Sequence, residues 1–203
     1  MGLGWCCFRN YAGHAKEIGG DVSYEYPRFF LKPASAHVEA DENGNNFIEL
    51  LRADEHIDHE VEMVIRLGPN LEPEAMCVGC DTTNRTRQTH AKNKRWPWTE
   101  GKAFRGSGVL GTWAPYNDTI MQVSLSVNGE MRQDDSTSLM IHSVADLIGH
   151  LKGWYDLTPG DLIWTGTPKG VGKMHVDDRV EASLVDAAGN VISKLSAICR
   201  VSE

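Results

Sequence analysis

The chain has 203 residues, of which 41% are hydrophobic and 24% are charged, an ordinary composition for a globular protein that can bury a sizeable core. Its formal net charge of −8 argues against a nucleic-acid-binding surface. No apolar run reaches the roughly 18 residues of a membrane span, and no basic stretch precedes a long apolar one near the N-terminus. We therefore expect a cytoplasmic protein, without a membrane partner or secretory signal, that forms one domain over residues 1–203.

In the first third of the chain, turn and capping residues separate short predicted elements. Asn10 is placed to cap a helix that ends at Gly19. The next elements are a strand at residues 29–32, a turn at residues 41–46 and a strand at residues 59–67, which the Gly68-Pro69 pair ends.

The rest of the chain is also rich in strands. Residues 72–80 suit a helix or a strand, and the polar residues 82–94 suit a helix. Residues 120–127 alternate apolar and polar side chains, which is typical of a half-buried strand, and residues 144–151 are apolar at helical spacing. Further elements are expected as a turn at residues 157–161 and strands at residues 162–164, 180–185 and 191–201. Because regular βαβ alternation is missing, we expect a mixed β (α+β) fold rather than a doubly wound sheet.

Five cysteines, an odd number, do not indicate a disulfide framework. Cys77 and Cys80 form a CxxC pair, but a structural zinc site would need a second pair at suitable spacing. A thioredoxin-like role would need a βαβ frame, which the pattern does not predict. Buried thiols are therefore favoured over a zinc or redox role.

Glu60 and Glu62 lie two residues apart in an apolar, strand-prone run. On a strand their side chains point to the same face, where two carboxylates repel each other and raise each other's pKa unless a cation lies between them. Hard divalent cations such as Mg²⁺ take oxygen ligands of this kind. From this motif alone, two solvated acids on an edge strand remain an open alternative.

Residues 160–172 form a second motif, in which a buried strand runs into a loop rich in glycine and hydroxyl groups. Backbone N–H groups of such a loop can approach an anionic ligand closely. The loop is not a phosphate-binding Walker motif, because Met174 follows Gly172-Lys173 where a Ser or Thr is required. An ordinary glycine-rich turn is the alternative.

The loop sequence Thr165–Gly172, preceded by Pro159-Gly160-Asp161, resembles the signature of the fumarylacetoacetate hydrolase superfamily. Five further blocks resemble that family in the expected order, at residues 10–17, 30–33, 59–62, 81–88 and 97–104. The resemblance covers most of the chain. It implies one catalytic domain with a β-roll or β-sandwich fold and a few short helices, usually assembled as a homodimer.

The resemblance also implies a metal site made by Glu60, Glu62 and Asp81, with Mg²⁺ or Mn²⁺ as the cofactor. Three carboxylates suit these cations better than zinc. His56 and His59 do not form the HExxH motif of a zinc protease, so His59 is expected at the surface or in support of the metal ligands.

His14 and Glu17 share one helix face at i, i+3 spacing, and Glu17 can orient the imidazole and raise its basicity. An i, i+3 pair of this kind alone is more often a surface contact. The block that contains it is similar to the catalytic dyad of the acylpyruvase members of the family, so the resemblance makes His14 and Glu17 a water-activating pair.

The remaining site residues are also implied by the resemblance. Arg85 and Gln88 would bind the carboxylate and oxo groups of the substrate, since arginine suits bidentate carboxylate binding. Lys102 would place an ammonium near a developing oxyanion, and Thr167 would donate a hydrogen bond to the carboxylate. Lys32 is expected either in the site or in a structural role.

The activity that follows is metal-dependent hydrolysis of a carbon–carbon bond in acylpyruvates, small-molecule 2,4-dioxo acids such as acetylpyruvate and fumarylpyruvate from aromatic catabolism. One alternative is decarboxylation of oxaloacetate or a related 2-oxo acid. Another is isomerase or hydratase chemistry of the 5-carboxymethyl-2-hydroxymuconate or 2-oxo-hept-ene-dioate type. A non-catalytic relative is the third alternative.

The sequence departs from the family pattern at Thr86 and Arg105, where the family usually has aspartate, and at Cys80, where it more often has asparagine or an apolar residue. These changes bear on substrate choice rather than on the proposed metal ligands. Residues 41–54 match none of the motifs and are expected to contact the distal acyl group.

Overall fold

A computed structural model describes residues 1–20, 22, 24–51 and 54–201 of the chain. Strands dominate, as the sequence predicts, and the helices are short. The helices are α1 (Ala12–Glu17), α2 (Arg85–Lys94), α3 (Thr99–Lys102) and α4 (Val144–Trp154), with single 3₁₀ turns at Ala34–Ala36 and Thr137–Leu139. Within the described part of the chain, no helix combines the length and apolar character needed to cross a membrane.

The larger sheet has the strand order β2-β1-β13-β6-β7-β9-β3, and β10 pairs with β7 beside this path. Its pairings are mixed, since β1 runs parallel to β13 while β6 runs antiparallel to β7. The strands are β1 (Gly4–Cys7), β2 (Phe29–Lys32), β3 (His37–Glu39), β6 (Val61–Leu67), β7 (Pro73–Asp81), β9 (Gly108–Leu110), β10 (Ala114–Pro115) and β13 (Leu162–Trp164).

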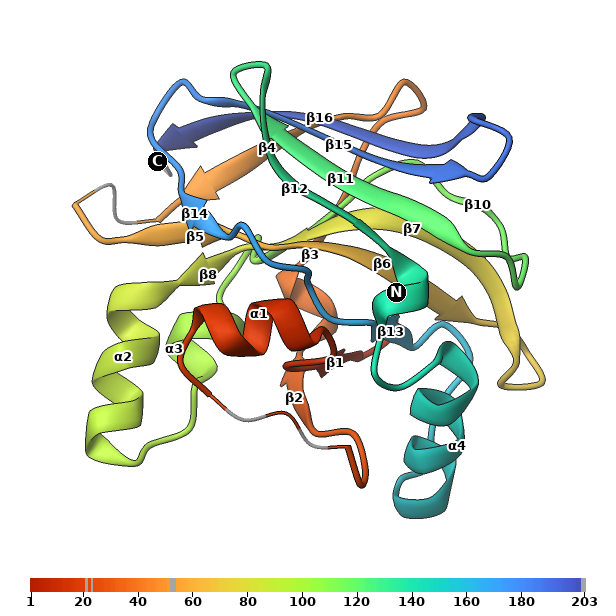
Figure 1. Ribbon diagram of the computed structural model, residues 1–203. Coiled ribbons are helices and arrows are strands. Elements are labelled where there is room, and N and C mark those ends of the chain that lie inside the picture. Colours follow the sequence, from red (N-terminus) through yellow and green to blue (C-terminus); the bar gives the residue numbers. More distant parts are fainter. Residues whose placement is uncertain (21, 23, 52–53, 202–203) are drawn as a thin grey trace.

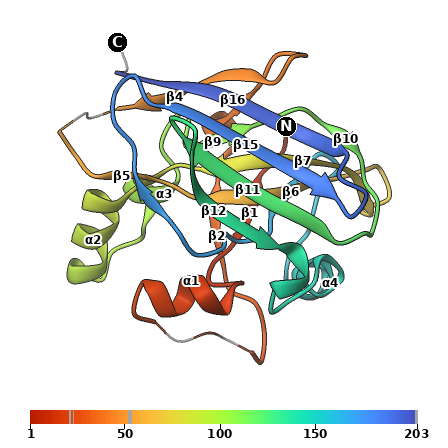
Figure 2. The same cartoon turned by 45° about the horizontal axis from the view of Figure 1, so that its top comes forward.

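A five-stranded sheet with the order β12-β11-β15-β16-β4 lies across β6 and β7, and the four α-helices lie on the other side of these two strands (Figure 1). The turned view in Figure 2 shows the same layering, with the five-stranded sheet in front. Its strands are β4 (Asn45–Leu50), β11 (Met121–Val127), β12 (Glu130–Ser136), β15 (Arg179–Asp186) and β16 (Val191–Val201). A small sheet joins β14 (Gly172–Lys173), β5 (Ile57–His59) and β8 (Thr83–Asn84).

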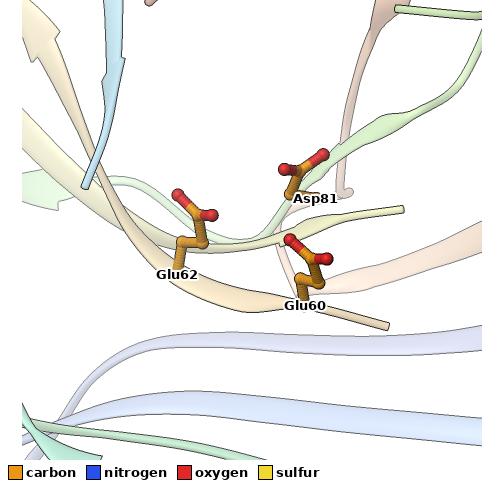
Figure 3. Close-up of side chains that lie close together, drawn as sticks. All are labelled: Glu60, Glu62 and Asp81. Atoms are coloured by element: carbon orange, nitrogen blue, oxygen red, sulfur yellow. The ribbon is translucent and has the colours of Figure 1, made fainter. Parts of the chain in front are cut away.

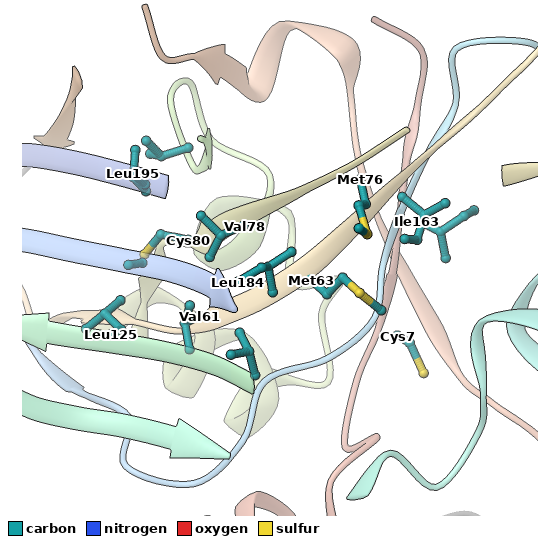
Figure 4. Close-up of a cluster of buried hydrophobic side chains, with 14 of the residues drawn as sticks. Cys7, Val61, Met63, Met76, Val78, Cys80, Leu125, Ile163, Leu184 and Leu195 are labelled. Carbon is teal, nitrogen blue, oxygen red and sulfur yellow. The ribbon is translucent and has the colours of Figure 1, made fainter. Parts of the chain in front are cut away.

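Most of the main core lies between the two larger sheets, and it continues to the buried face of α4. Strand alternation decides which side chains of the sheets enter it. Val61 and Met63 of β6 pack with Val78 and Cys80 of β7 and with Leu125 of β11 in this core (Figure 4). Side chains at the alternate positions of β6 and β7 point to the opposite face, toward the helices. The carboxylate of a residue between two core positions therefore emerges on the helix side of the larger sheet.

Most predicted elements are confirmed, and three differ in detail. The strand expected over residues 59–67 is interrupted at Glu60, where the chain leaves the small sheet and enters the larger one. Residues 72–80 belong to a strand, β7, which continues to Asp81, and α2 begins only at Arg85 after the short strand β8. The Asn84 side chain caps α2 by accepting a hydrogen bond from the Arg87 backbone N–H at 3.0 Å.

The prediction that Asn10 caps the first helix is wrong. Tyr11 occupies the N-cap position of α1 without a side-chain cap. The buried Asn10 amide instead donates to the backbone oxygens of His142 and Thr165, at 2.9 and 2.8 Å. A buried carbonyl without a hydrogen-bond donor would cost more free energy than the loss of a helix cap. Asn10 therefore connects the start of α1 to two distant segments.

All five cysteines are free and buried, which confirms the prediction of buried thiols. Burial raises the pKa of Cys80 to about 12, which keeps its thiol protonated at neutral pH.

Candidate metal centre

Three buried carboxylates meet at the point where β5, β6 and β7 approach one another. Glu60 lies at the junction between β5 and β6, Glu62 lies in β6, and Asp81 ends β7. One oxygen of each carboxylate lies within 4.8 Å of the other two, and Figure 3 shows the three groups pointing toward one another. The alternative of solvated acids on an edge strand is excluded, because none of the three residues is more than 4% exposed.

Strand register explains why these residues meet. Cys80 pairs with Val61 across β6 and β7, and the Asp81 N–H donates to the Glu60 backbone oxygen at 2.8 Å. Val61 and Cys80 both point into the main core, so their neighbours Glu62 and Asp81 point to the helix side.

Three cations compensate part of this charge, and two of them, Lys102 and Arg85, line the pocket in front of the carboxylates. Lys102 Nζ lies 2.8 Å from Glu60 Oε2 and 2.7 Å from Asp81 Oδ2, and Arg85 Nη2 lies 2.7 Å from Glu60 Oε1. Burial alone would raise the pKa of Glu60, but Lys102 and Arg85 outweigh it and hold the pKa well below its usual range. Burial alone would lower the pKa of Lys102, but the charges of Asp81 and Glu60 outweigh it and raise the pKa, so the ammonium stays charged.

Glu62 lacks such compensation. The Gly166 N–H donates to Glu62 Oε2 at 2.8 Å, and no cationic side chain of the described residues forms a salt bridge with it. Burial, together with the charges of Asp81 and Glu60, raises the pKa of Glu62 well above its ordinary value. A divalent cation would supply the missing positive charge, and three carboxylates are a suitable donor set for it. The buried acidic triad therefore fits a divalent metal ion.

Lys32 contacts Asp81 of the triad from outside the pocket. Its completely buried ammonium lies 2.9 Å from Asp81 Oδ1 and donates to the Ser107 hydroxyl at 2.8 Å and to the Lys102 backbone oxygen. It does not line the pocket in front of the triad. Of the two roles expected for Lys32, this geometry matches the structural one.

His14 and Glu17 form a contact beside the triad. His14 Nδ1 lies 3.2 Å from Glu17 Oε2, and the Gly170 N–H donates to Glu17 Oε1 at 2.9 Å. His14 is 4% exposed and lines the same pocket as the three carboxylates. Since Nδ1 faces Glu17, the other ring nitrogen, Nε2, is left to interact in the pocket.

The N–H groups of the glycine-rich loop, which could approach an anionic ligand, donate to carboxylates of the protein itself. Gly166 donates to Glu62, and Gly170 donates to Glu17. Gly166 has a φ of +93°, and a Cβ built there would lie 2.8 Å from the Asn10 Cβ, so only glycine fits at this position. The loop therefore positions one member of the acidic triad and one member of the His14–Glu17 pair.

Arg85 is held by three acceptors. It donates to Gln88 Oε1 at 2.8 Å, to Glu60 Oε1 at 2.7 Å and, through Nε, to Asp58 Oδ2 at 2.8 Å. The i, i+3 pairing of Arg85 and Gln88 is thus present. Asp58 was not singled out in the sequence, although it continues the alternation of Glu60 and Glu62 by two residues and could have been found from that pattern.

Gln133 of β12 is a second functional position that the sequence analysis missed. Its amide nitrogen donates to Thr167 Oγ1 at 2.8 Å, and its amide oxygen lies 3.0 Å from the Val61 N–H and 2.9 Å from His59 Nδ1. A single glutamine in a polar strand of the other sheet carries no local signal of this role. His59 is 1% exposed, so the surface position considered for it is wrong, and burial lowers the pKa of its imidazole.

A small, partly open pocket lies in front of the triad. Of the predicted site residues, all but Glu17 and Lys32 line it, and Glu17 reaches it only through its contact with His14. Its lining is completed by residues that the sequence analysis did not select, namely Cys7, Phe8, Arg9, Ile18, Phe30, Lys92 and Trp98. These additions make the pocket partly aromatic and partly cationic.

Several positions singled out in the sequence lie elsewhere. None of the described residues of 41–54 lines the pocket, and residues 52 and 53 lie outside the described part of the chain. The Thr86 hydroxyl accepts a hydrogen bond from the His56 backbone N–H at 3.0 Å. Arg105 Nη2 lies 3.6 Å from Glu49 Oε2. Neither Thr86 nor Arg105 lines the pocket, and the Cys80 side chain belongs to the main core.

Comparison with known proteins agrees with this fold. The family model described as the C-terminal part of fumarylacetoacetate hydrolase matches residues 4–196, so the chain belongs to the fumarylacetoacetate hydrolase family. This is a family of enzymes, whose related members are named as hydrolases, isomerases and tautomerases.

Among its relatives, the chain is 37% identical over 193 residues to the mitochondrial oxaloacetate tautomerase FAHD1 of Mus musculus, an alignment that covers 88% of this chain and 85% of the mouse protein. The fumarylpyruvate hydrolase of Pseudomonas aeruginosa, solved in complex with Mn²⁺ and pyruvate, superposes with a TM-score of 0.86 at 31% identity, over 98% of this chain and 90% of that one. The 5-carboxymethyl-2-hydroxymuconate delta-isomerase of Mycobacterium smegmatis superposes with a TM-score of 0.80 at 28% identity, over 99% and 79% of the two chains.

Proposed function

We propose that this protein is a Mg²⁺- or Mn²⁺-dependent hydrolase that cleaves a carbon–carbon bond in acylpyruvates such as acetylpyruvate and fumarylpyruvate. The observation that carries the proposal is that His14, which contacts Glu17, lines one pocket with the buried acidic triad. A carboxylate-oriented imidazole next to three metal-ligating oxygens provides a general base and an electrophilic site together. The fumarylpyruvate hydrolase neighbour supports the same substrate class.

Different site residues bind the metal and the substrate carboxylate. A divalent cation held by Glu60, Glu62 and Asp81 would act as a Lewis acid toward the 2-oxo group of the substrate. Gln88, which Arg85 orients, and Thr167 present polar groups to the same pocket and bind the adjacent carboxylate. These contacts place the distal carbonyl of a 2,4-dioxo acid in front of His14.

His14 then accepts a proton from water while Glu17 stabilises the imidazolium. The water oxygen bonds to the distal carbonyl carbon, and the bond from that carbon to the neighbouring methylene carbon breaks. The electron pair of the broken bond remains on the departing pyruvate fragment as an enolate, close to the Lys102 ammonium. His14 returns its proton to the enolate carbon, so the products are a carboxylic acid and pyruvate.

The test is an assay of purified protein with Mg²⁺ on acetylpyruvate, fumarylpyruvate and oxaloacetate, for the wild type and His14→Ala. We expect acylpyruvate hydrolysis by the wild type and a loss of about 100-fold or more in His14→Ala, within the usual range for removal of a general base. His175→Ala, on the exposed turn before β15, is the control and should retain activity. Full hydrolysis by His14→Ala would remove the role of the pair, and no turnover of any 2-oxo acid would remove the proposed function.

Oxaloacetate is a second candidate substrate, favoured by the relatives named as oxaloacetate tautomerases. In a keto–enol interconversion His14 would move a proton between the C3 carbon and the C2 oxygen, and no attacking water would be needed. Ultraviolet absorbance of the enol distinguishes tautomerisation from decarboxylation, which releases pyruvate and carbon dioxide. Faster enol decay without pyruvate release would assign the tautomerase activity.

A further inference from the structure

The pocket extends outward from the acidic triad along two aromatic rings. The ring centroids of Phe30 and Trp98 lie 6.4 Å apart, and both residues line the pocket. Lys102 Nζ lies 5.0 Å from the centroid of Phe30, and Lys92 Nζ lies 5.0 Å from that of Trp98. The aromatic wall therefore has one ammonium at the triad and a second one at its outer end.

The two ammonium groups differ in their partners. Lys102 forms ion pairs with two carboxylates of the triad, whereas no carboxylate of the described residues forms an ion pair with Lys92. Partial burial, followed by the positive charges of Arg85, Arg9 and Lys102, lowers the pKa of Lys92. The outer end of the pocket thus has a surplus of positive charge that an anion would relieve.

Lys92 is exposed to solvent and lines the pocket from α2. It lies on α2, the helix that also carries Arg85 and Gln88, so the same rigid element presents groups to both ends of the pocket. The Trp98 ring under its ammonium is held by an edge contact with Phe8, at 5.5 Å between centroids. A planar carbon chain could lie along these rings and end at Lys92.

We propose, on the basis of the function proposed above, that Lys92 on the face of Trp98 binds a second carboxylate at the far end of the substrate. The protein then prefers dicarboxylic 2-oxo acids with an extended, unsaturated chain, such as fumarylpyruvate, over monocarboxylic acylpyruvates. A charge-assisted contact at the outer end of the pocket gives about tenfold discrimination.

The kinetic test compares fumarylpyruvate, which has two carboxylates, with acetylpyruvate, which has one. In Lys92→Met we expect kcat/KM for fumarylpyruvate to fall about 10- to 30-fold, mainly through KM, and that for acetylpyruvate to stay within about twofold. Lys92→Arg should restore the preference. Lys94→Met is the matched control, because Lys94 is exposed on the same helix and does not line the pocket. Equal losses for both substrates, or no loss for fumarylpyruvate, would overturn the proposal.

A binding measurement separates this proposal from the proposed function. Calorimetric titration with 2-oxoadipate and with pyruvate, in the presence of Mg²⁺, should show that Lys92→Met weakens only 2-oxoadipate binding. If the wild type hydrolyses no acylpyruvate but shows this selective loss, the proposed function fails and the role of Lys92 stands. If Lys92→Met binds 2-oxoadipate as the wild type does, or the wild type binds neither acid, the role of Lys92 is overturned.

Discussion

Glu62 is the least compensated carboxylate of the candidate metal centre. Glu60 and Asp81 each contact Lys102, whereas Glu62 accepts a hydrogen bond from the Gly166 N–H and has no salt bridge among the described residues. An unpaired carboxylate that is 2% exposed costs folding free energy, which a bound cation would offset. The protein thus retains a destabilising carboxylate in the candidate metal centre.

Glu62→Gln should therefore separate stability from metal binding. Without metal, we expect the variant to be about 1 to 2 kcal/mol more stable than the wild type, because the buried charge is removed. With Mg²⁺ in excess, only the wild type should gain stability, since an amide is a weaker ligand than a carboxylate. Urea unfolding with and without Mg²⁺ measures both effects, and Glu72→Gln, at an exposed salt bridge with Lys152, is the control. An equal Mg²⁺ gain in both proteins would contradict the assignment of Glu62 as a ligand.

Glu17 can be tested apart from His14. In Glu17→Gln the contacts with Gly170 and His14 keep their shape, but the negative charge that stabilises the imidazolium is lost. We expect kcat to fall about 10- to 100-fold while KM stays within about twofold. Steady-state kinetics on the best substrate measures this, with Glu25→Gln at an exposed position as the control. An unchanged kcat would show that Glu17 only positions the loop.

At the scale of elements, the site depends on connections between segments that are distant in sequence. Gln133 of β12 links the junction of β5 and β6 to the loop after β13 through Val61 and Thr167. Asn10 links the start of α1 to the same loop at Thr165. Because these amides are buried and satisfied, they fix the loop that holds Glu62 and Glu17.

Gln133→Ala should accordingly lower the free energy of unfolding much more than the same substitution of an exposed glutamine on the neighbouring strand. The truncation leaves the Val61 N–H and the Thr167 hydroxyl without their buried partner, so we expect a loss of about 2 to 4 kcal/mol in the free energy of unfolding. Gln122→Ala on β11 removes an exposed contact with Asp134 and should cost less than about 0.5 kcal/mol. Chemical denaturation of both variants checks this, and equal costs would contradict the role of Gln133.

For the whole molecule, the main core and the site occupy opposite faces of the larger sheet. The face of β6 with Val61 and Met63 packs on the five-stranded sheet, and the face with Glu62 opens toward the helices. Most apolar contacts that stabilise the fold therefore lie away from the polar groups of the site, and a smaller cluster with Val64 and Trp164 shares the face of the site. The homodimer expected from the family resemblance remains a proposal, and light scattering of the purified protein would test it.

Stability toward acid should depend on His37, which is buried at the edge of the larger sheet. The Trp164 indole N–H donates to His37 Nε2 at 3.3 Å, so this nitrogen is unprotonated. Burial, followed by the positive charge of Lys32, lowers the pKa of His37 to about 4. Between pH 6.5, the ordinary value, and pH 4, the unfolded chain takes up a proton that the folded protein excludes. Stability is therefore present above this range and falls as the pH decreases through it.

We expect this histidine to account for up to about 3 kcal/mol of the stability lost between pH 7 and pH 4. Glutamine at this position can still accept from Trp164 but does not titrate, so His37→Gln should lose less stability over the same range. Urea unfolding of both proteins at several pH values isolates the effect, because the carboxylates titrate in both. His175→Gln, at an exposed position, should retain the wild-type pH dependence, and parallel curves for His37→Gln and the wild type would contradict the prediction.

The sequence by itself predicted the strand-rich fold, the Glu60–Glu62 pair and the His14–Glu17 pair, because alternation along a strand and i, i+3 spacing on a helix are local properties. The pairing of Arg85 with Gln88 was predictable for the same reason. Asp81 was predicted only from the family resemblance. Only the tertiary structure decided that Gln133 and Asn10 hold the glycine-rich loop and that Lys92 lies at the outer end of the pocket. These contacts depend on the register and packing of elements far apart in the chain, which no local spacing encodes.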